Sequence, residues 1–174
     1  MNMLKKILYF FIIFIFFQTT LRANNSFYLY FKYILNESNA GKKAQVFLKD
    51  RLSNGIKKLQ ETEKKIQAEE KEIIKQKKII SADEYKKKVT SLRNKVSSLQ
   101  KERNQLLDSV AKQRSKARSE LLKNLNPIIK EYMKEKKIRM VLDKKSLLLA
   151  DENLDITKDI MGILNKKLKS IKLN

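Results

Sequence analysis

A heptad repeat of apolar residues is the strongest constraint on what this chain can fold into. Between residues 39 and 80, apolar residues stand seven positions apart at Leu52, Leu59, Ile66, Ile73 and Ile80. A sustained heptad with charged flanks is typical of a coiled coil, in which one apolar stripe of a helix faces a partner helix. The interleaved positions are charged after Ile56, at Glu63, Glu70 and Lys77. We therefore expect a helix seam that is only half apolar.

A second helix is predicted to begin directly after Ser81. Ser81 and Glu84 match a capping box, in which a hydroxyl and a carboxylate three residues apart bind the free amides of a helix start. Beyond it, apolar residues alternate steps of three and four, except at Arg103 and Gln113. The predicted seam residues of this helix are Val89, Leu92, Val96, Leu99, Leu106 and Val110.

The two helical segments have nearly equal lengths. At ~1.5 Å per residue, residues 39–80 would span roughly 63 Å and residues 82–126 roughly 68 Å. One break between equal arms predicts an antiparallel helical hairpin with its tip near Ser81. The alternative is a parallel coiled coil with another chain and a kink at Ser81. Three apolar residues outside the seam remain available for weak contacts: Ile74, Ile79 and Leu107.

Short strands are predicted at both ends of the hairpin. Aromatic and β-branched residues favour strands over about 26–31, 138–143 and 146–150. Pro127 suits the first turn of a helix that continues, kinked, to about residue 136. Asp155 is a suitable cap for a final amphipathic helix over about 156–168. The predicted fold class is α+β and predominantly helical: a long antiparallel coiled-coil hairpin on a small body of strands.

The strands are expected to make the body an oligomerisation module. Three short strands are marginal as an independent sheet, and a bare two-helix arm buries little apolar surface. We therefore expect neighbouring chains to complete the body. The predicted oligomerisation residues are Phe27, Leu29, Phe31, Ile138, Met140 and Leu142.

The first 23 residues are predicted to be a secretory signal peptide. Lys5 and Lys6 precede an unbroken apolar run over residues 7–17, and Ala23 supplies a small residue at the exit. The run is short beside the ~20 residues needed to span a bilayer. An uncleaved membrane anchor is the alternative. We expect export, followed by one domain over residues 24–174.

Composition excludes most catalytic chemistry. The chain contains no Cys and no His, so it can have no thiolate or imidazole metal ligand, no Ser-His-Asp triad and no disulfide. Paired acids such as Glu69 and Glu70 lie among lysines of a predicted helix and are explained by solvated ion pairs. We expect no enzyme activity, no cofactor and no metal.

The formal net charge of +21 is typical of a nucleic-acid-binding protein, but its distribution is not. The positive charge is spread evenly along the arms, which offer only Phe47 and Tyr85 as aromatic stacking platforms. Export would also separate the protein from the genome. We therefore expect no specific nucleic-acid partner, although contact with anionic lipid or a membrane surface fits such a charge.

At its two ends the mature chain resembles the Skp/OmpH family of periplasmic chaperones. The resemblance rests on residues 33–44 and 125–129 on either side of the hairpin, and on the closing segments 138–144 and 154–157. It covers essentially all of residues 26–168. The order of these segments is specific, whereas a Lys- and Glu-rich coiled coil is found in many unrelated proteins.

The resemblance implies a homotrimer with a β-barrel-like body and three tentacles enclosing a cavity. It further implies a periplasmic chaperone that holds unfolded outer-membrane proteins without ATP. It assigns no client-binding residue in this sequence. Two other functions remain: an exported or membrane-anchored structural coiled-coil spacer, and a cationic nucleic-acid-binding protein.

Overall fold

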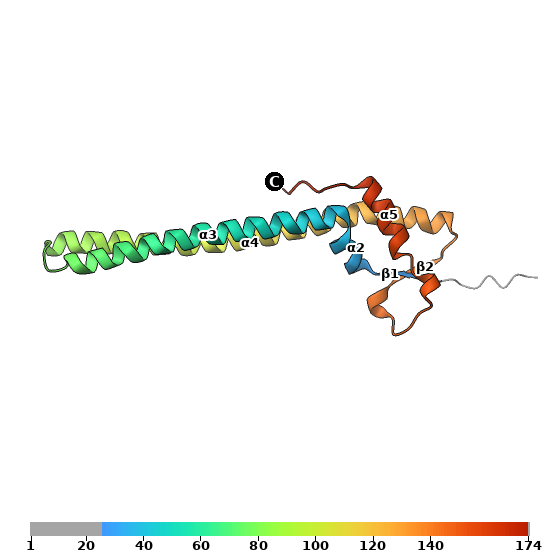
Figure 1. Cartoon of the computed structure of the whole chain (residues 1–174), viewed down its shortest axis with the longest axis horizontal. Helices are drawn as coiled ribbons and strands as arrows, with labels where there is room; N and C mark the ends of the chain where they lie inside the picture. The colour runs from blue at the N-terminus through green and yellow to red at the C-terminus, as the bar shows by residue number, and fades with distance from the viewer. Residues whose placement is uncertain (1–25, 174) are drawn as a thin grey trace, which may run out of the picture.

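The computed structural model describes residues 26–173, so the predicted signal peptide lies outside the described residues. A long two-helix hairpin projects from a small body, as Figure 1 shows. This arrangement confirms the predicted fold class, a helical hairpin with a small pair of strands. Within residues 26–173, no helix is both long enough and apolar enough to span a bilayer.

The hairpin consists of α3 (Asn39–Gln76) and α4 (Ala82–Glu135). The predicted cap is present at the start of α4, where the Ser81 hydroxyl accepts a hydrogen bond from the Glu84 amide at 3.2 Å. The first arm ends at Gln76 and not at Ile80. The Gln76 carbonyl accepts hydrogen bonds from the amides of Ile79 and Ile80, which turns the chain before the cap. The prediction of Ile80 as a helical seam residue is therefore wrong.

The return helix continues past the predicted end of the arm at residue 126. Pro127 lies inside α4, which runs on to Glu135 and so belongs to both the arm and the body. A proline inside a helix forfeits its own amide hydrogen bond but does not end the helix where packing holds it. Ile128, directly after the proline, and Tyr132, about one turn further on, are buried in the body core and supply that packing.

The predicted seam is buried along most of its length. Leu59, Ile66 and Leu99 form one buried cluster, and Leu92 and Leu106 pack against it. Ile73 and Val110 are also buried, and Leu52 and Val89 are half-buried. Val96 is the exception among these predicted residues, because its side chain is 51% exposed. It lines the same groove as Glu70, whose charged side chain is exposed and keeps this stretch in contact with water.

Two polar interruptions of the seam have partners. The guanidinium of Arg103 lies 3.6 Å from the carboxylate of Glu63 across the hairpin. The Gln113 side-chain amide donates to the backbone carbonyl of Leu173 at 2.8 Å. A further cross-arm ion pair joins Lys95 to Glu69 at 2.6 Å. Exposed pairs of this kind add little stability, but they fit only one register of the two helices.

The body contains a two-stranded parallel sheet, β1 (Ser26–Leu29) and β2 (Met140–Asp143). Two strand predictions are corrected. Phe31 is the first residue of helix α2 (Phe31–Glu37) and not the end of a strand. Ile138 precedes β2 and is buried in the core. The register pairs Phe27 with Val141, so Val141 shares the core face, and Met140 and Leu142 lie on the other face.

The predicted strand over residues 146–150 is absent from the described structure. The Asp143 carboxylate accepts a hydrogen bond from the Lys145 amide at 3.3 Å and starts a short 3₁₀ turn, η1 (Lys144–Ser146). This turn directs the chain away from the sheet, so the leucines that follow have no strand to pair with. A second turn, η2 (Glu152–Leu154), leads back to the body.

The body core lies where α2, α4 and α5 (Thr157–Lys167) meet. Ile34, Leu125, Ile160 and Leu164 are fully buried there. The predicted C-terminal helix over about 156–168 is thus present within one residue at each end. Asp155 also acts near the predicted position, because its carboxylate accepts a hydrogen bond from the Thr157 amide at 2.9 Å.

A C-terminal strap (residues 168–173) runs back from α5 along the base of the hairpin, as seen in Figure 1. Leu173 is 4% exposed and packs in a cluster formed by both arms, with Ala44 and Leu48 of α3 and Val110 and Ala117 of α4. The strap therefore joins the body to the arm at a second place.

A tyrosine in the core gives the body a predictable response to alkaline pH. The Tyr132 hydroxyl donates to Asp159 at 2.5 Å. Burial, this hydrogen bond and the charges of Asp159 and Glu135 raise the pKa of Tyr132 to about 12. Because this pKa lies above the unfolded value of about 10, the neutral phenol stabilises the fold below pH ~10, and that contribution is lost as pH rises to about 12.

We expect the Tyr132→Phe variant to lose less stability at alkaline pH than the wild type, because it lacks the phenol. The variant forgoes one hydrogen bond, at a cost of about 1 kcal/mol near neutral pH. Its free energy of unfolding should then approach that of the wild type as pH rises from about 9 to about 11.5. Urea unfolding across this range measures the gap. A gap that stays constant would show that the phenol ionises equally easily in both states.

Candidate functional site

The body presents an apolar loop that its own chain leaves uncovered. The loop follows η1, and its Leu148 and Leu149 are 100% and 95% exposed. Met140 of β2 is half exposed. β2 pairs only with β1 in the described structure, so its other edge is open. An open strand edge beside exposed leucines is suited to contact with another chain.

Most residues predicted for oligomerisation are already used within the chain. Leu29 and Ile138 belong to the buried core, and Phe27 and Phe31 pack against it. Leu142 is half-buried, which leaves Met140 as the most exposed of the six. The sequence predicted a body strand over residues 146–150, but Leu148 and Leu149 were not among the predicted oligomerisation residues. Their run of three consecutive leucines in a charged chain is the signal that could have identified them.

A polar cluster fixes the two ends of this loop. The Thr157 hydroxyl accepts a hydrogen bond from the Tyr30 amide at 2.8 Å and donates one to Asp155. Asp155 also contacts the Lys144 ammonium at 3.4 Å. Burial acts to raise the pKa of Asp155, but the hydrogen bonds from Thr157 and Lys144 outweigh it and lower the pKa below its usual value. The carboxylate therefore stays charged at neutral pH and holds the loop ends at the sheet.

The arm carries apolar side chains that the hairpin does not bury. Ile74, Ile79 and Leu107, the residues predicted to lie outside the seam, are all exposed. Val46, Ile56 and Val96 are exposed as well. They are spread among the lysines of both helices and the tip turn, so the arm offers many weak apolar contacts within a positive surface.

Near the tip, the two helices enclose a groove of about 460 Å³ that we call the tip groove. Its apolar lining consists of Ile73, Ile74, Tyr85, Val89, Leu92 and Val96. Glu70 and Arg93 are its charged lining residues. Four of these were predicted to be closed within the seam: Ile73, Val89, Leu92 and Val96. The groove is the place where the seam fails to close.

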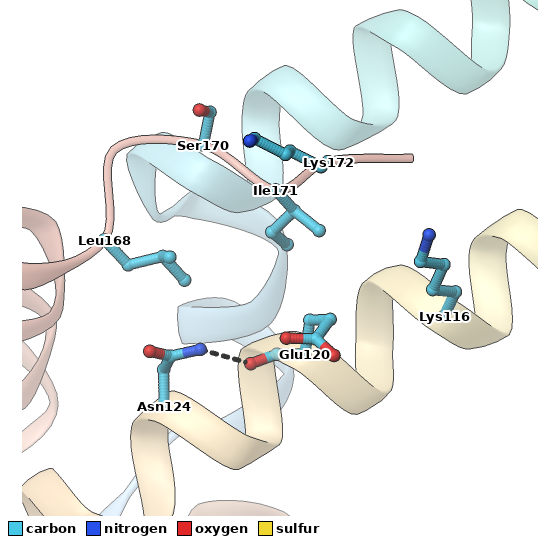
Figure 2. Close-up of a pocket in the computed structure, with 7 residues that line it drawn as sticks. All are labelled: Lys116, Glu120, Asn124, Leu168, Ser170, Ile171 and Lys172. Atoms are coloured by element: carbon cyan, nitrogen blue, oxygen red, sulfur yellow. Dashed lines mark hydrogen bonds between the residues drawn. The ribbon is translucent and has the colours of Figure 1, made fainter. Parts of the chain in front are cut away.

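A second hollow, of about 330 Å³, lies between the C-terminal strap and α4. Figure 2 shows Leu168 and Ile171 of the strap above Glu120 and Asn124 of α4. The Asn124 side-chain amide donates to the Glu120 carbonyl at 2.7 Å, within its own helix. Within residues 26–173, no cluster of acidic side chains could hold a metal ion.

Comparison with known proteins supports the architecture. A family model described as outer membrane protein (OmpH-like) matches residues 26–164. A crystal structure described as that of an outer membrane chaperone (OmpH-like), from Caulobacter crescentus CB15, aligns with a TM-score of 0.80. The two proteins share 21% sequence identity, and the alignment covers 85% of this chain and 88% of the other. No curated protein matches the chain.

Proposed function

Because the chain belongs to the OmpH-like family, we propose that it is a periplasmic chaperone that holds unfolded outer-membrane proteins without ATP. The observation that carries this proposal is the arm: a long hairpin that exposes separate apolar side chains within a strongly positive surface. Weak apolar contacts hold an unfolded chain without selecting one sequence, and positive charge attracts acidic chains. In this proposal residues 1–23 direct export to the periplasm and are removed.

We also propose that the protein works as a homotrimer assembled through the body. The open edge of β2, Met140 and the exposed pair Leu148 and Leu149 supply the contact surface. Assembly there would leave the arms projecting from one body, since the tip lies at the far end of the molecule from the sheet (Figure 1). Several arms around one space could surround a client that one arm could not retain.

The decisive test is suppression of aggregation. We expect the wild-type protein to keep a urea-unfolded outer-membrane β-barrel protein soluble after dilution, with no effect of added ATP, as measured by light scattering. A Leu148→Asp/Leu149→Asp variant should keep its helical circular dichroism, because both side chains are exposed, but sediment as a monomer and suppress aggregation less well.

Each result separates two explanations. A wild-type protein that leaves aggregation unchanged would support the structural coiled-coil spacer, which needs no client. A Leu148→Asp/Leu149→Asp variant that sediments like the wild type would contradict the proposed assembly surface and leave the chaperone function standing.

A further inference from the structure

We propose that the tip groove is a binding site for an extended polypeptide segment in which aromatic or aliphatic side chains alternate with carboxylates. The inference rests on the proposed function and assigns the client contact to a defined place in the arm. The occupant is a segment of an unfolded protein chain.

The geometry of the groove fits apolar side chains. Ile73 is buried at its base, whereas Ile74 and Val96, one from each helix, are 60% and 51% exposed. An entering side chain would therefore meet apolar groups from both helices at once. A volume of about 460 Å³ falls within the ~300–1,000 Å³ typical of ligand sites. The exposed apolar residues elsewhere on the arm, such as Val46 and Leu107, do not line this groove.

The charge around the groove identifies the kind of segment. Residues 70–96 contain nine Lys and Arg against four Asp and Glu. Ion pairs engage Glu72 and Glu84 with Lys75 and Lys88, and Lys95 is paired with Glu69, so six cations and two carboxylates of this stretch remain outside these pairs. The groove lining itself contains one residue of each charge, Arg93 and Glu70. The surplus of positive charge favours a segment that carries carboxylates beside its apolar side chains.

Tyr85 gives the groove a flat apolar face. The Lys77 ammonium lies 5.9 Å from the centre of its ring, within the range of a cation–π contact. Lys77 belongs to the tip turn, so this contact connects the turn to the groove. A planar aromatic side chain of the client can pack against Tyr85, and its neighbouring carboxylate can reach the lysines of the turn.

The experiment compares two double variants of the full-length mature protein. Ile74→Ser/Val96→Ser alters the groove, and Val46→Ser/Leu107→Ser alters equally exposed residues on the same two helices outside it. The probe is a fluorescein-labelled peptide in which Phe and Glu recur among Ser residues, with its dissociation constant measured by anisotropy. We expect the groove variant to weaken binding about tenfold. The control variant removes two separate weak contacts, so it should weaken binding by no more than about twofold.

Two altered peptides and a binding assay with lipid vesicles complete the test. Replacing Phe by Ser, or Glu by Lys, in the peptide should each weaken wild-type binding. Equal losses in the two protein variants, or no loss in the groove variant, would overturn the inference. So would a groove variant that binds the peptide normally but no longer binds phosphatidylglycerol vesicles, because the groove would then be a lipid site.

The test also separates this inference from the proposed function. If the wild type suppresses client aggregation but the groove variant binds peptide normally, the chaperone function stands and the groove assignment fails. If peptide binding depends on the groove but the wild type does not suppress aggregation, the binding site stands and the chaperone function fails.

Discussion

Gly41→Ala should destabilise the protein by about 3 kcal/mol, which corresponds to a fall in melting temperature of about 10 °C. Gly41 lies in the first turn of α3, where the chain leaves α2 at Ser38. A Cβ at this position would lie 2.0 Å from the carbonyl oxygen of Leu35, a backbone atom that cannot move away alone. The Ser38 hydroxyl, which accepts a hydrogen bond from the Gly41 amide, would also be only 3.0 Å from that Cβ.

Gly162→Ala is the matched control. Gly162 lies within α5, and a Cβ there would meet no atom within 4 Å. Alanine is the better helix former, so this variant should gain up to about 1 kcal/mol. Thermal unfolding followed by circular dichroism measures both variants. If Gly41→Ala melts at the wild-type temperature, the close approach of α2 to α3 does not exist in solution.

Leu173→Ala should have an effect of similar size, a loss of about 3 kcal/mol. Its side chain is almost fully buried between the two arms, and removing it would leave a cavity beside Leu48 and Val110. Urea unfolding gives the loss of stability, and hydrogen exchange should show faster opening of the α3 amides near Ala44 and Leu48.

Leu149→Ala provides the comparison for this variant. It deletes the same atoms from a side chain that is 95% exposed, so the stability of the single chain should change by less than about 0.5 kcal/mol. Similar losses for the two leucines would mean that the C-terminal strap is not docked on the hairpin in solution.

The hairpin could be predicted from sequence because its determinants are local. Heptad spacing identified the seam, and the Ser81 cap identified the start of the return helix. Even two irregularities of the pattern are informative, since Glu63 and Arg103 interrupt opposite helices and form an ion pair. The exposure of the Val96 side chain could not be predicted. Heptad spacing does not reveal whether two helices pack tightly along a stretch that also contains Glu70.

The body was harder to predict because its determinants are distant in sequence. Alternation grouped Ile138, Met140 and Leu142 as oligomerisation residues, but Ile138 lies in the body core and the parallel register places Val141 beside Phe27. A one-residue offset exchanges the faces of a strand, and no local signal fixes it here. The docking of Leu173 depends on a cluster assembled from both arms, so nothing near the C-terminus indicates it.

The parallel pairing of β1 with β2 also constrains the order in which the chain can fold. The two strands lie on either side of the hairpin in sequence, so their pairing closes a loop that contains both arms. In a disordered chain, the entropy lost on closing a loop grows with the logarithm of its length. Once α3 and α4 have packed along their length, Ala40 and Leu121 lie in one cluster. Most of the loop between the two strands is then already closed. Pairing of the long arm therefore lowers the entropy cost of bringing the two distant strands together.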